Sequence, residues 1–325
     1  MARVQVLSLG EMADVERELE PAFDLLRVAG PRIEEALAAH GPSIRAIATR
    51  GRDLIGEEML ARLPALELIA NYGVGYDSVD VEAARRRGIV VTNTPEVLND
   101  EVADLAIALL LATVRQIPQA DRFVRSGRWL KENFPLGPTL RDRTVGLIGM
   151  GRIGRRIAQR LRAFEVPVVY HSRMPQPDLP YRHHPDLRAM AADVDTLLAI
   201  LPGGAATRKL VDASVLSALG PRGIFVNVAR GSVVDEPALV EALRSKTILA
   251  AGLDVFADEP RVPEALLGME NVVLLPHVGS ATHYTRGLMG KLVVDNIVSW
   301  FEGKGPLTPV PETPWRPHAM SRKPA

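Results

Sequence analysis

Apolar residues along the chain gather in short runs that alternate with amphipathic segments. From Val4 to Thr94 we expect strands at the short, mainly apolar runs and helices at the amphipathic segments between them. The strands are expected at Val4–Leu7, Ile44–Ala48, Leu66–Ala70 and Ile89–Thr92, and the helices at Ile33–Ala39, Glu57–Leu63 and Val81–Arg87. Strands that alternate with helices are typical of a parallel sheet with helices on its faces.

A long helix separates this region from a second one of the same kind. We expect it to be capped by Asn99 or Asp100 and to reach about Val114, with Pro118 breaking or restarting it. The stretch 122–138 that follows is aromatic and poorly periodic, and indicates an arm or loop. Further strands are expected at Val145–Ile148, Val168–Tyr170, Thr196–Ile200, Ile224–Val228, Leu249–Leu253 and Val272–Leu275, with helices such as Pro237–Leu243 between them and a final helix over Thr285–Phe301.

A chain of 325 residues is too long for one core, and two α/β halves indicate two domains. Because the helix after Ser280 leads back towards the first half, we expect a discontinuous domain of residues 1–98 and 285–325 around an inserted domain of residues 99–284. The proline-rich tail from Pro306 is expected to be extended or disordered, and His183 and His184 to be solvated in a polar loop.

Charge and composition narrow the class of protein. Basic and acidic residues number 39 each, so no basic footprint for nucleic acid is indicated. The chain has no cysteine, which excludes disulfides and thiolate metal sites, and we find no other metal-ligand spacing. The N-terminus lacks the apolar core of a signal peptide, and the apolar run 105–114 is too short for a bilayer. We therefore expect a soluble, cytoplasmic protein without nucleic-acid or membrane partners.

Three glycines follow the strand at Val145–Ile148 in G-x-G-x-x-G spacing, and a helical pattern follows them. Gly149 allows a sharp turn, Gly151 allows a pyrophosphate to approach the backbone, and Gly154 allows the helix to pack close to the strand. The phosphates would then bind the helix N-terminus. The spacing alone is a weak signal, but with strand and helix in place it predicts a dinucleotide site.

A second glycine pair lies in N-Y-G-V-G-Y-D, residues 71–77, after the strand Leu66–Ala70. Bare backbone N–H groups at this edge are where open α/β sheets bind ligands. The alternative is a glycine turn shaped only by packing.

Ionisable residues follow three strands of the second half. Arg230 comes after V-N-V-A, Asp254 and Glu259 after a glycine-leucine strand end, and His277 after L-L-P. Arg230 offers a planar fork for a carboxylate, and His277 can transfer a proton near neutral pH while Glu259 holds its imidazole. The alternative is a surface salt bridge and a core histidine.

The order G-M-G-R-I-G, V-N-V-A-R-G, G-L-D-V-F-x-x-E-P and L-P-H-V-G-S-A-T resembles the D-isomer-specific 2-hydroxyacid dehydrogenases, from about Asn71 to Met289. The segments N-Y-G-V-G-Y-D-S-V-D and V-L-N-D-E-V-A-D-L-A are most similar to the glyoxylate/hydroxypyruvate reductase branch, which is 2-ketogluconate reductase-like. The resemblance implies two doubly wound parallel-sheet domains, a Rossmann-type cofactor domain inserted in a flavodoxin-like substrate domain.

The resemblance also implies residue roles. His277 would be the acid/base, Glu259 its partner, and Arg230 the group that binds the substrate carboxylate, with the N–H groups of Val74 and Gly75 as further donors. The implied cofactor contacts are Gly149, Gly151, Arg152, Ile153, Gly154, Ser172, Arg173, Leu201, Pro202, Thr207, Val228, Ala229, Arg230, Asp254, His277 and Gly279. A homodimer is implied too, with the arm containing Trp129 and Phe134 reaching the partner; Trp129 as core filler is the alternative.

The cofactor preference follows from one position. An NAD site carries an acidic residue about twenty residues past the glycines. Ser172 and Arg173 lie there, 18 and 19 residues after Gly154, and the next acid is Asp178 beyond two prolines. A hydroxyl and a guanidinium suit the 2′-phosphate of NADP(H), so we expect NADP(H) to be preferred over NAD(H).

Two other functions use the same motifs. A regulator that senses cofactor redox state, like the C-terminal-binding transcriptional corepressors, could retain all three ionisable residues. A methyltransferase would use the glycine loop for a nucleoside but leaves those residues unexplained. Within the reductase interpretation, glyoxylate, hydroxypyruvate, 2-keto-D-gluconate and arylpyruvates share the same 2-oxo acid head, and the sequence leaves the choice among them open.

Overall fold

The computed structural model describes residues 3–315, which form two compact units. Within the described residues, the first unit comprises residues 3–98 and 282–315, and the second comprises residues 99–281. The pattern of the sequence places the second boundary at Thr285, three residues too late. It lies at Thr282 because the Thr282 hydroxyl caps α12 (His283–Phe301), accepting a hydrogen bond from the Thr285 N–H at 3.1 Å.

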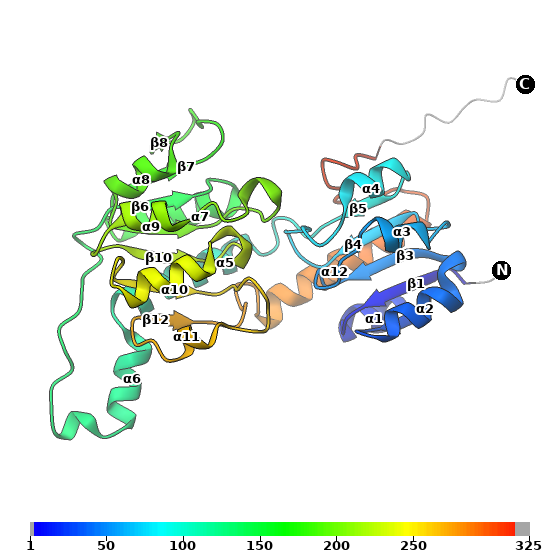
Figure 1. Ribbon diagram of the computed structural model, residues 1–325. Coiled ribbons are helices and arrows are strands. Elements are labelled where there is room, and N and C mark those ends of the chain that lie inside the picture. Colours follow the sequence, from blue (N-terminus) through cyan, green and yellow to red (C-terminus); the bar gives the residue numbers. More distant parts are fainter. Residues whose placement is uncertain (1–2, 316–325) are drawn as a thin grey trace, which may run out of the picture. The chain divides into compact units, whose positions relative to one another are not determined.

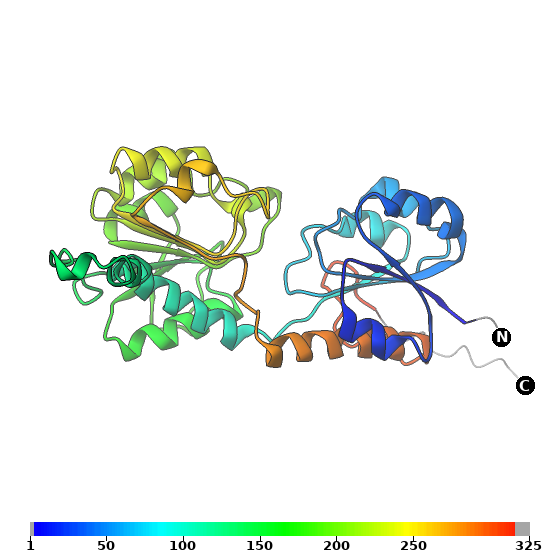
Figure 2. The same cartoon turned by 90° about the horizontal axis from the view of Figure 1, so that it is seen from below.

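The first unit is a five-stranded parallel sheet with the order β2-β1-β3-β4-β5, the flavodoxin-like order. Its strands are β1 (Gln5–Leu9), β2 (Asp24–Val28), β3 (Ile44–Thr49), β4 (Leu68–Asn71) and β5 (Val90–Thr92). Its helices are α1 (Ala13–Leu19), α2 (Arg32–His40), α3 (Glu57–Ala61), α4 (Val81–Arg86) and α12, with a 3-10 turn at η1 (Gly41–Ser43). Figure 2 shows α1 and α12 on one face of this sheet and α2 on the other.

Both faces of this sheet are covered, which is why its strands are nearly continuous apolar runs. Alternate residues of β1 point to opposite sides, so Leu7 packs with Ile69 on one side and Val6 packs with Leu68 on the other. The second of these clusters includes Ile297 of α12, although in the sequence all residues of the second unit lie between β1 and α12.

Up to Trp315 the segment after α12 is ordered, which removes the disordered alternative of the prediction and leaves the extended one, since Pro309 forms an antiparallel bridge with Thr92; residues 316–325 lie outside the described part. The Val310 N–H donates to the Val91 carbonyl at 2.9 Å, and the Thr313 hydroxyl accepts from the Val91 N–H at 2.9 Å. Val310 is 1% exposed. The segment therefore runs along β5 and covers the edge of the sheet.

The second unit is a seven-stranded parallel sheet with the order β12-β11-β10-β9-β6-β7-β8, the doubly wound order of a dinucleotide-binding fold with one added strand. Its strands are β6 (Val145–Ile148), β7 (Val168–His171), β8 (Arg182–His184), β9 (Thr196–Ala199), β10 (Ile224–Asn227), β11 (Ala250–Leu253) and β12 (Val272–Leu274). Its helices are α5 (Asn99–Val114), α6 (Ile117–Arg125), α7 (Arg152–Ala163), α8 (Leu187–Asp193), α9 (Ala213–Leu219), α10 (Glu236–Arg244) and α11 (Glu264–Leu267), with 3-10 turns η2 (Arg128–Leu130), η3 (Ala205–Thr207) and η4 (Gly231–Val233). The two sheets confirm the predicted fold class.

The strand β8 corrects the interpretation of His183 and His184. Both belong to an edge strand that pairs with β7, and His184 is 4% exposed rather than solvated. The His183 ring stacks at 5.1 Å on Tyr170, and its Nε2 lies 2.9 Å from the Ser172 carbonyl. The polar, three-residue strand has no alternating pattern, because an edge strand buries only part of its surface.

An arm extends from the second unit between α5 and β6 (Figure 1). Pro118 stands in the first turn of α6 and restarts the helix, as predicted. Phe134 packs edge-on against Phe123 at 5.3 Å between ring centroids. Trp129 is 66% exposed, which removes the alternative that it fills the core of its own chain, and Leu130 and Leu136 are more exposed still, at 91% and 103%.

Candidate functional site

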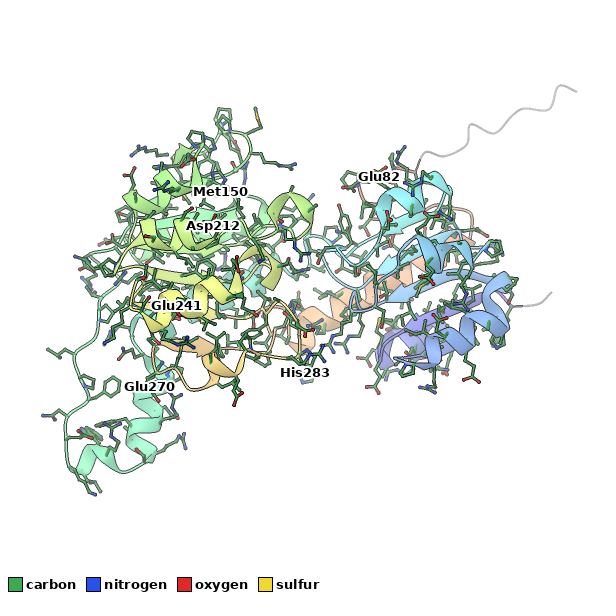
Figure 3. The ribbon with its side chains drawn as sticks, in the orientation of Figure 1. Glu82, Met150, Asp212, Glu241, Glu270 and His283 are labelled. Carbon is green, nitrogen blue, oxygen red and sulfur yellow. The ribbon has the colours of Figure 1, made fainter. Side chains whose placement is uncertain are left out.

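The turn between β6 and α7, around the labelled Met150 in Figure 3, needs two of its three glycines for a steric reason. A Cβ on Gly149, whose φ is +102°, would lie 2.2 Å from the Ile200 carbonyl oxygen, and a Cβ on Gly154 would lie 2.5 Å from the Gly149 carbonyl oxygen. A Cβ on Gly151 would meet nothing within 4 Å. Gly149 and Gly154 therefore close the turn, while Gly151 keeps it open to a ligand.

The N-cap residue of α7 is Gly151, which has no side chain that could cap the helix. The first N–H groups of this helix, those of Arg152 and Ile153 among them, point out of its N-terminal end, where the helix dipole favours an anion. An open backbone and an uncapped helix N-terminus fit the pyrophosphate of a dinucleotide.

The other predicted cofactor residues of this unit follow neighbouring strands. Leu201, Pro202 and Thr207 follow β9, where the Thr207 hydroxyl donates to the Pro202 carbonyl at 2.8 Å. Val228 and Ala229 follow β10. Since all strands are parallel, these residues lie on the edge that carries the glycine turn, beside the switch point between β6 and β9.

Ser172 and Arg173 follow β7, where the ribose of a bound dinucleotide would lie. No described carboxylate pairs with Arg173, whereas Asp178, the nearest acid along the chain, binds Arg155 at 2.6 Å between Oδ2 and Nη1. The hydrogen bond from Arg155 lowers the pKa of Asp178, so this carboxylate is an ion-pair partner. Gln176 ties the segment to the glycine turn by donating to the Met150 carbonyl at 2.9 Å. Arg155 and Gln176 carry no signal in the sequence, because their contacts join the loop after β7 to α7 and to the glycine turn.

His277 and Glu259 meet as predicted, with 2.7 Å between the histidine Nδ1 and the glutamate Oε2. The other oxygen, Oε1, accepts from the Phe256 N–H at 3.1 Å. Burial raises the pKa of Glu259, but the hydrogen bond and charge of His277, the Phe256 N–H and the charge of Arg230 outweigh burial, and the net pKa is lowered. Glu259 is therefore an ionised partner that accepts from Nδ1 and leaves Nε2 of His277 as the ring nitrogen that can act on a ligand.

The backbone of His277 is left-handed, with φ of +55°, and Asp254 holds it there. The His277 N–H donates to the Asp254 carbonyl at 2.8 Å, while the Asp254 carboxylate accepts from the Val278 and Gly279 N–H groups at 2.8 and 3.0 Å. Asp254 is 2% exposed, and burial raises the pKa of its carboxyl in spite of these donors. Asp254 therefore fixes the loop that carries His277, a role that the sequence analysis did not assign.

Arg230 follows β10 in the same unit, and its Nη1 donates to the Ala229 carbonyl at 2.7 Å. The next residue, Gly231, brings the loops of β10 and β11 into direct contact, since a Cβ there would lie 1.9 Å from the Phe256 carbonyl carbon. This close approach allows the charge of Arg230 to act on Glu259. The second unit thus brings Arg230, Glu259 and His277 together at the edge that carries the glycine turn.

Val74 and Gly75 belong to the first unit, in the loop that follows β4. This is the carboxyl edge of the five-stranded sheet, the usual place for ligands in such sheets.

The described chain offers neither a metal centre nor a membrane span. Within residues 3–315, no three His, Asp or Glu side chains are grouped in a way that could hold a metal ion. No helix in that range combines the length and apolar character that crossing a bilayer requires.

The doubly wound sheet, the glycine turn and the histidine–carboxylate pair define a dinucleotide-dependent oxidoreductase. The sequence model of the D-isomer specific 2-hydroxyacid dehydrogenase NAD binding domain matches residues 107–279. The chain belongs to this family, and its second unit is the NAD-binding domain.

Relatives match along nearly the whole chain. The glyoxylate/hydroxypyruvate reductase A of Arabidopsis thaliana is 44% identical over 95% of this chain and 100% of its own. The 2-ketogluconate reductase of Gluconobacter oxydans is 41% identical over 95% and 99%. Among solved structures, the NADPH-dependent glyoxylate/hydroxypyruvate reductase of Sinorhizobium meliloti, in complex with NADP and malonate, is 51% identical and covers 98% of this chain and 100% of its own, with a TM-score of 0.93.

Proposed function

We propose that the protein reduces small 2-oxo acids, such as glyoxylate and hydroxypyruvate, to D-2-hydroxy acids with NADPH. The observation that carries this proposal is the 2.7 Å contact between His277 and Glu259 on the edge of the dinucleotide-binding sheet. The names of the relatives, which include glyoxylate, hydroxypyruvate, hydroxyphenylpyruvate and 2-ketogluconate reductases, support the substrate class.

The proton is supplied by His277. Because its Nδ1 donates to Glu259, the proton that reaches the substrate comes from Nε2. The ionised Glu259 keeps the imidazole ring in one orientation through this contact. The proton passes to the oxygen of the carbonyl as that oxygen gains negative charge.

Arg230 binds the substrate carboxylate through its planar fork and stabilises charge on the carbonyl oxygen. The N–H groups of Val74 and Gly75 are further donors to the carboxylate. When NADPH is bound, its nicotinamide supplies the hydride to the carbonyl carbon, while the glycine turn, Arg152 and Ile153 hold its phosphates.

The test is His277→Ala with glyoxylate and NADPH. We expect kcat to fall about a hundred- to ten-thousandfold, the usual contribution of a general acid, with the Kd of NADPH unchanged. A kcat within a few-fold of the wild type would refute the role of His277. Wild-type protein that binds NADPH but turns over no 2-oxo acid would instead favour the redox-sensing regulator.

We also propose that NADPH is preferred over NADH. Arg173 has no described acid partner, and Asp178 is neutralised by Arg155. The NADP in the related Sinorhizobium meliloti structure supports this preference. A charge-assisted bond to phosphate is worth about 1.5–3 kcal/mol, so we expect kcat/KM to favour NADPH about ten- to a hundredfold, and Arg173→Ala to lose that factor. An equal or better kcat/KM with NADH would contradict the proposal.

We further propose a homodimer that uses the arm. Exposed apolar side chains at Trp129, Leu130 and Leu136 are costly in water and suit a protein interface. Light scattering after gel filtration should give twice the chain mass for the wild type and the chain mass for Leu130→Asp with Leu136→Asp; a monomeric wild type would exclude the dimer. A cytoplasmic location, which cell fractionation would test, is proposed with it.

A further inference from the structure

Two asparagines donate hydrogen bonds to the carbonyl groups of the loop after β4. The Asn71 Nδ2 donates to the Gly73 and Gly75 carbonyls, at 3.0 Å each, and the Asn93 Nδ2 donates to the Val74 carbonyl at 2.9 Å. Three consecutive carbonyls therefore face side-chain amides within the same unit.

This arrangement fixes where the N–H groups of the loop point. In a planar trans peptide the N–H lies opposite to the carbonyl, so the N–H groups of Val74, Gly75 and Tyr76 are directed away from the two asparagines. None of these three N–H groups donates to any residue within 3–315. Successive backbone N–H groups that have no acceptor in the described chain can bind an anion, and Tyr76 adds a third donor to the two expected from the sequence.

The amide of Asn71 is held rigidly enough to impose this geometry. Asn71 is the last residue of β4, pairs with Thr49 of β3, and is 1% exposed. Gly51, in the loop after β3, has φ of +72°, and a Cβ there would lie 3.1 Å from the Asn71 Oδ1. The loop after β3 therefore packs closely against the amide of Asn71. Only an NH2 group can donate to two carbonyl oxygens at once, which fixes the orientation of the amide.

Asn93 is held by the segment that follows α12. Its backbone N–H donates to the Thr308 carbonyl at 3.2 Å, and its carbonyl accepts from the Thr308 hydroxyl at 2.6 Å. The Asn93 side chain is thereby placed against the loop independently of Asn71.

We propose that Asn71 and Asn93 are positioning residues that hold the N–H groups of Val74, Gly75 and Tyr76 as a preformed receptor for the carboxylate of the substrate. The proposal rests on the proposed function and deepens it, because it names what makes the first unit selective for a 2-oxo acid over an uncharged carbonyl compound. The asparagines do not touch the substrate; they act through the peptide groups that do.

The test compares Asn71→Ala and Asn93→Ala with the wild type. Oxalate, a dianion that is not reduced, probes the receptor in the NADPH complex by calorimetry and needs no turnover. Losing the orientation of one charge-assisted donor corresponds to about ten- to a hundredfold, so we expect the oxalate Kd and the glyoxylate KM to rise by that factor in Asn71→Ala. Asn93→Ala should shift both in the same direction by a smaller factor, because it removes one bond instead of two.

Comparing the change in KM with the change in kcat distinguishes a positioning role from a merely structural one. Loss of carboxylate binding raises KM and leaves kcat within about threefold, whereas a disordered loop lowers kcat as well as weakening binding. The NADPH Kd should not change. Asn271→Ala is the matched control, since the Asn271 Nδ2 also donates to two carbonyls, those of Leu243 and Leu249 at 3.3 and 3.2 Å, but in the other unit. It should lose thermal stability without changing the oxalate Kd.

Two outcomes would overturn the proposal: an oxalate Kd within twofold of the wild type in both variants, or an equal rise in Asn271→Ala. If Asn71→Ala does not fold, Asn93→Ala decides alone. A failure of the proposed function looks different, because the wild type would then fail to reduce glyoxylate whatever the asparagines do to oxalate binding.

Discussion

Replacing Glu259 by glutamine tests the acid–base pair without changing its shape. Two N–H donors converge on this side chain, Nδ1 of His277 at 2.7 Å and the Phe256 N–H at 3.1 Å, one on each oxygen. A carboxylate accepts from both, whereas the amide of glutamine has one acceptor and one donor. In the Glu259→Gln variant the NH2 group of glutamine would meet either the Phe256 N–H or Nδ1–H of His277, which places two donors against each other. The alternative is that the imidazole loses its Nδ1 proton.

The magnitude follows from the contact that is lost. A hydrogen bond to a charged group contributes about 1.5–3 kcal/mol. Because the His277 and Glu259 side chains are 42% and 32% exposed in the described chain, solvent screens the pair, and the lower part of this range applies. About 1.5–2 kcal/mol of transition-state stabilisation corresponds to an about twelve- to thirtyfold lower kcat at about 1.4 kcal/mol per factor of ten.

The assay is steady-state reduction of glyoxylate at saturating NADPH, with the NADPH Kd measured by fluorescence. Glu236→Gln is the matched control, since Glu236 accepts a single N–H, that of Ala257 in the same loop, at 3.0 Å, and glutamine can accept it equally well. We expect kcat to fall only in Glu259→Gln. Equal kcat values in the two variants would refute the reasoning from the two donors.

Three further changes test other parts of the structure. Gly154→Ala should melt several degrees below Gly151→Ala, because a Cβ meets the Gly149 carbonyl at 2.5 Å in the first and nothing within 4 Å in the second, and overpacking costs about 1–3 kcal/mol; equal melting temperatures would contradict the contact. Arg230→Lys should lower kcat/KM for glyoxylate at least about tenfold, because an ammonium cannot reproduce a two-pronged contact; an unchanged value would mean that another cation binds the substrate. Burial and the hydrogen bond to Glu312 raise the pKa of Tyr76 to about 12. Since this pKa lies above the value of about 10 in the unfolded chain, the neutral hydroxyl stabilises the folded protein fully below pH 10, and this stabilisation is lost towards pH 12. The urea midpoint of the wild type should therefore exceed that of Tyr76→Phe by less and less between pH 10 and pH 12. A difference in midpoints that stays constant over this interval would contradict the raised pKa.

Most of the fold could be predicted because buried parallel strands are continuous apolar runs, and these were visible in every central strand. The two strands that were missed, β2 and β8, lie at sheet edges. The residues Asp24–Val28 of β2 are mostly half-buried or exposed, and β8 is the polar triplet Arg182–His184. The other edge strands, β5 and β12, are mostly buried and carry apolar runs, whereas β2 and β8 have little core to face, so their sequences carry neither a run nor an alternation.

Part of the candidate site could likewise be predicted from the sequence, and part could not. Arg230, Glu259 and His277 could be expected at one edge because each follows a strand, and parallel strands end at the same edge. The supporting contacts of Asp254 and Asn71 could not, because they depend on which backbone groups the loops present. A polar residue at a strand end looks the same in the sequence whether it binds a ligand or holds a loop.

The segment that runs along β5 has a consequence for how the chain is made. The first 98 residues cannot close their core alone, since Ile297 of α12 packs into the cluster around Val6, and Val310 pairs with Val91. The second unit, by contrast, is one uninterrupted stretch, residues 99–281. On the ribosome the cofactor-binding unit therefore completes its core first, and the N-terminal strands stay incomplete, with one sheet edge open, until α12 and the segment around Val310 have been synthesised.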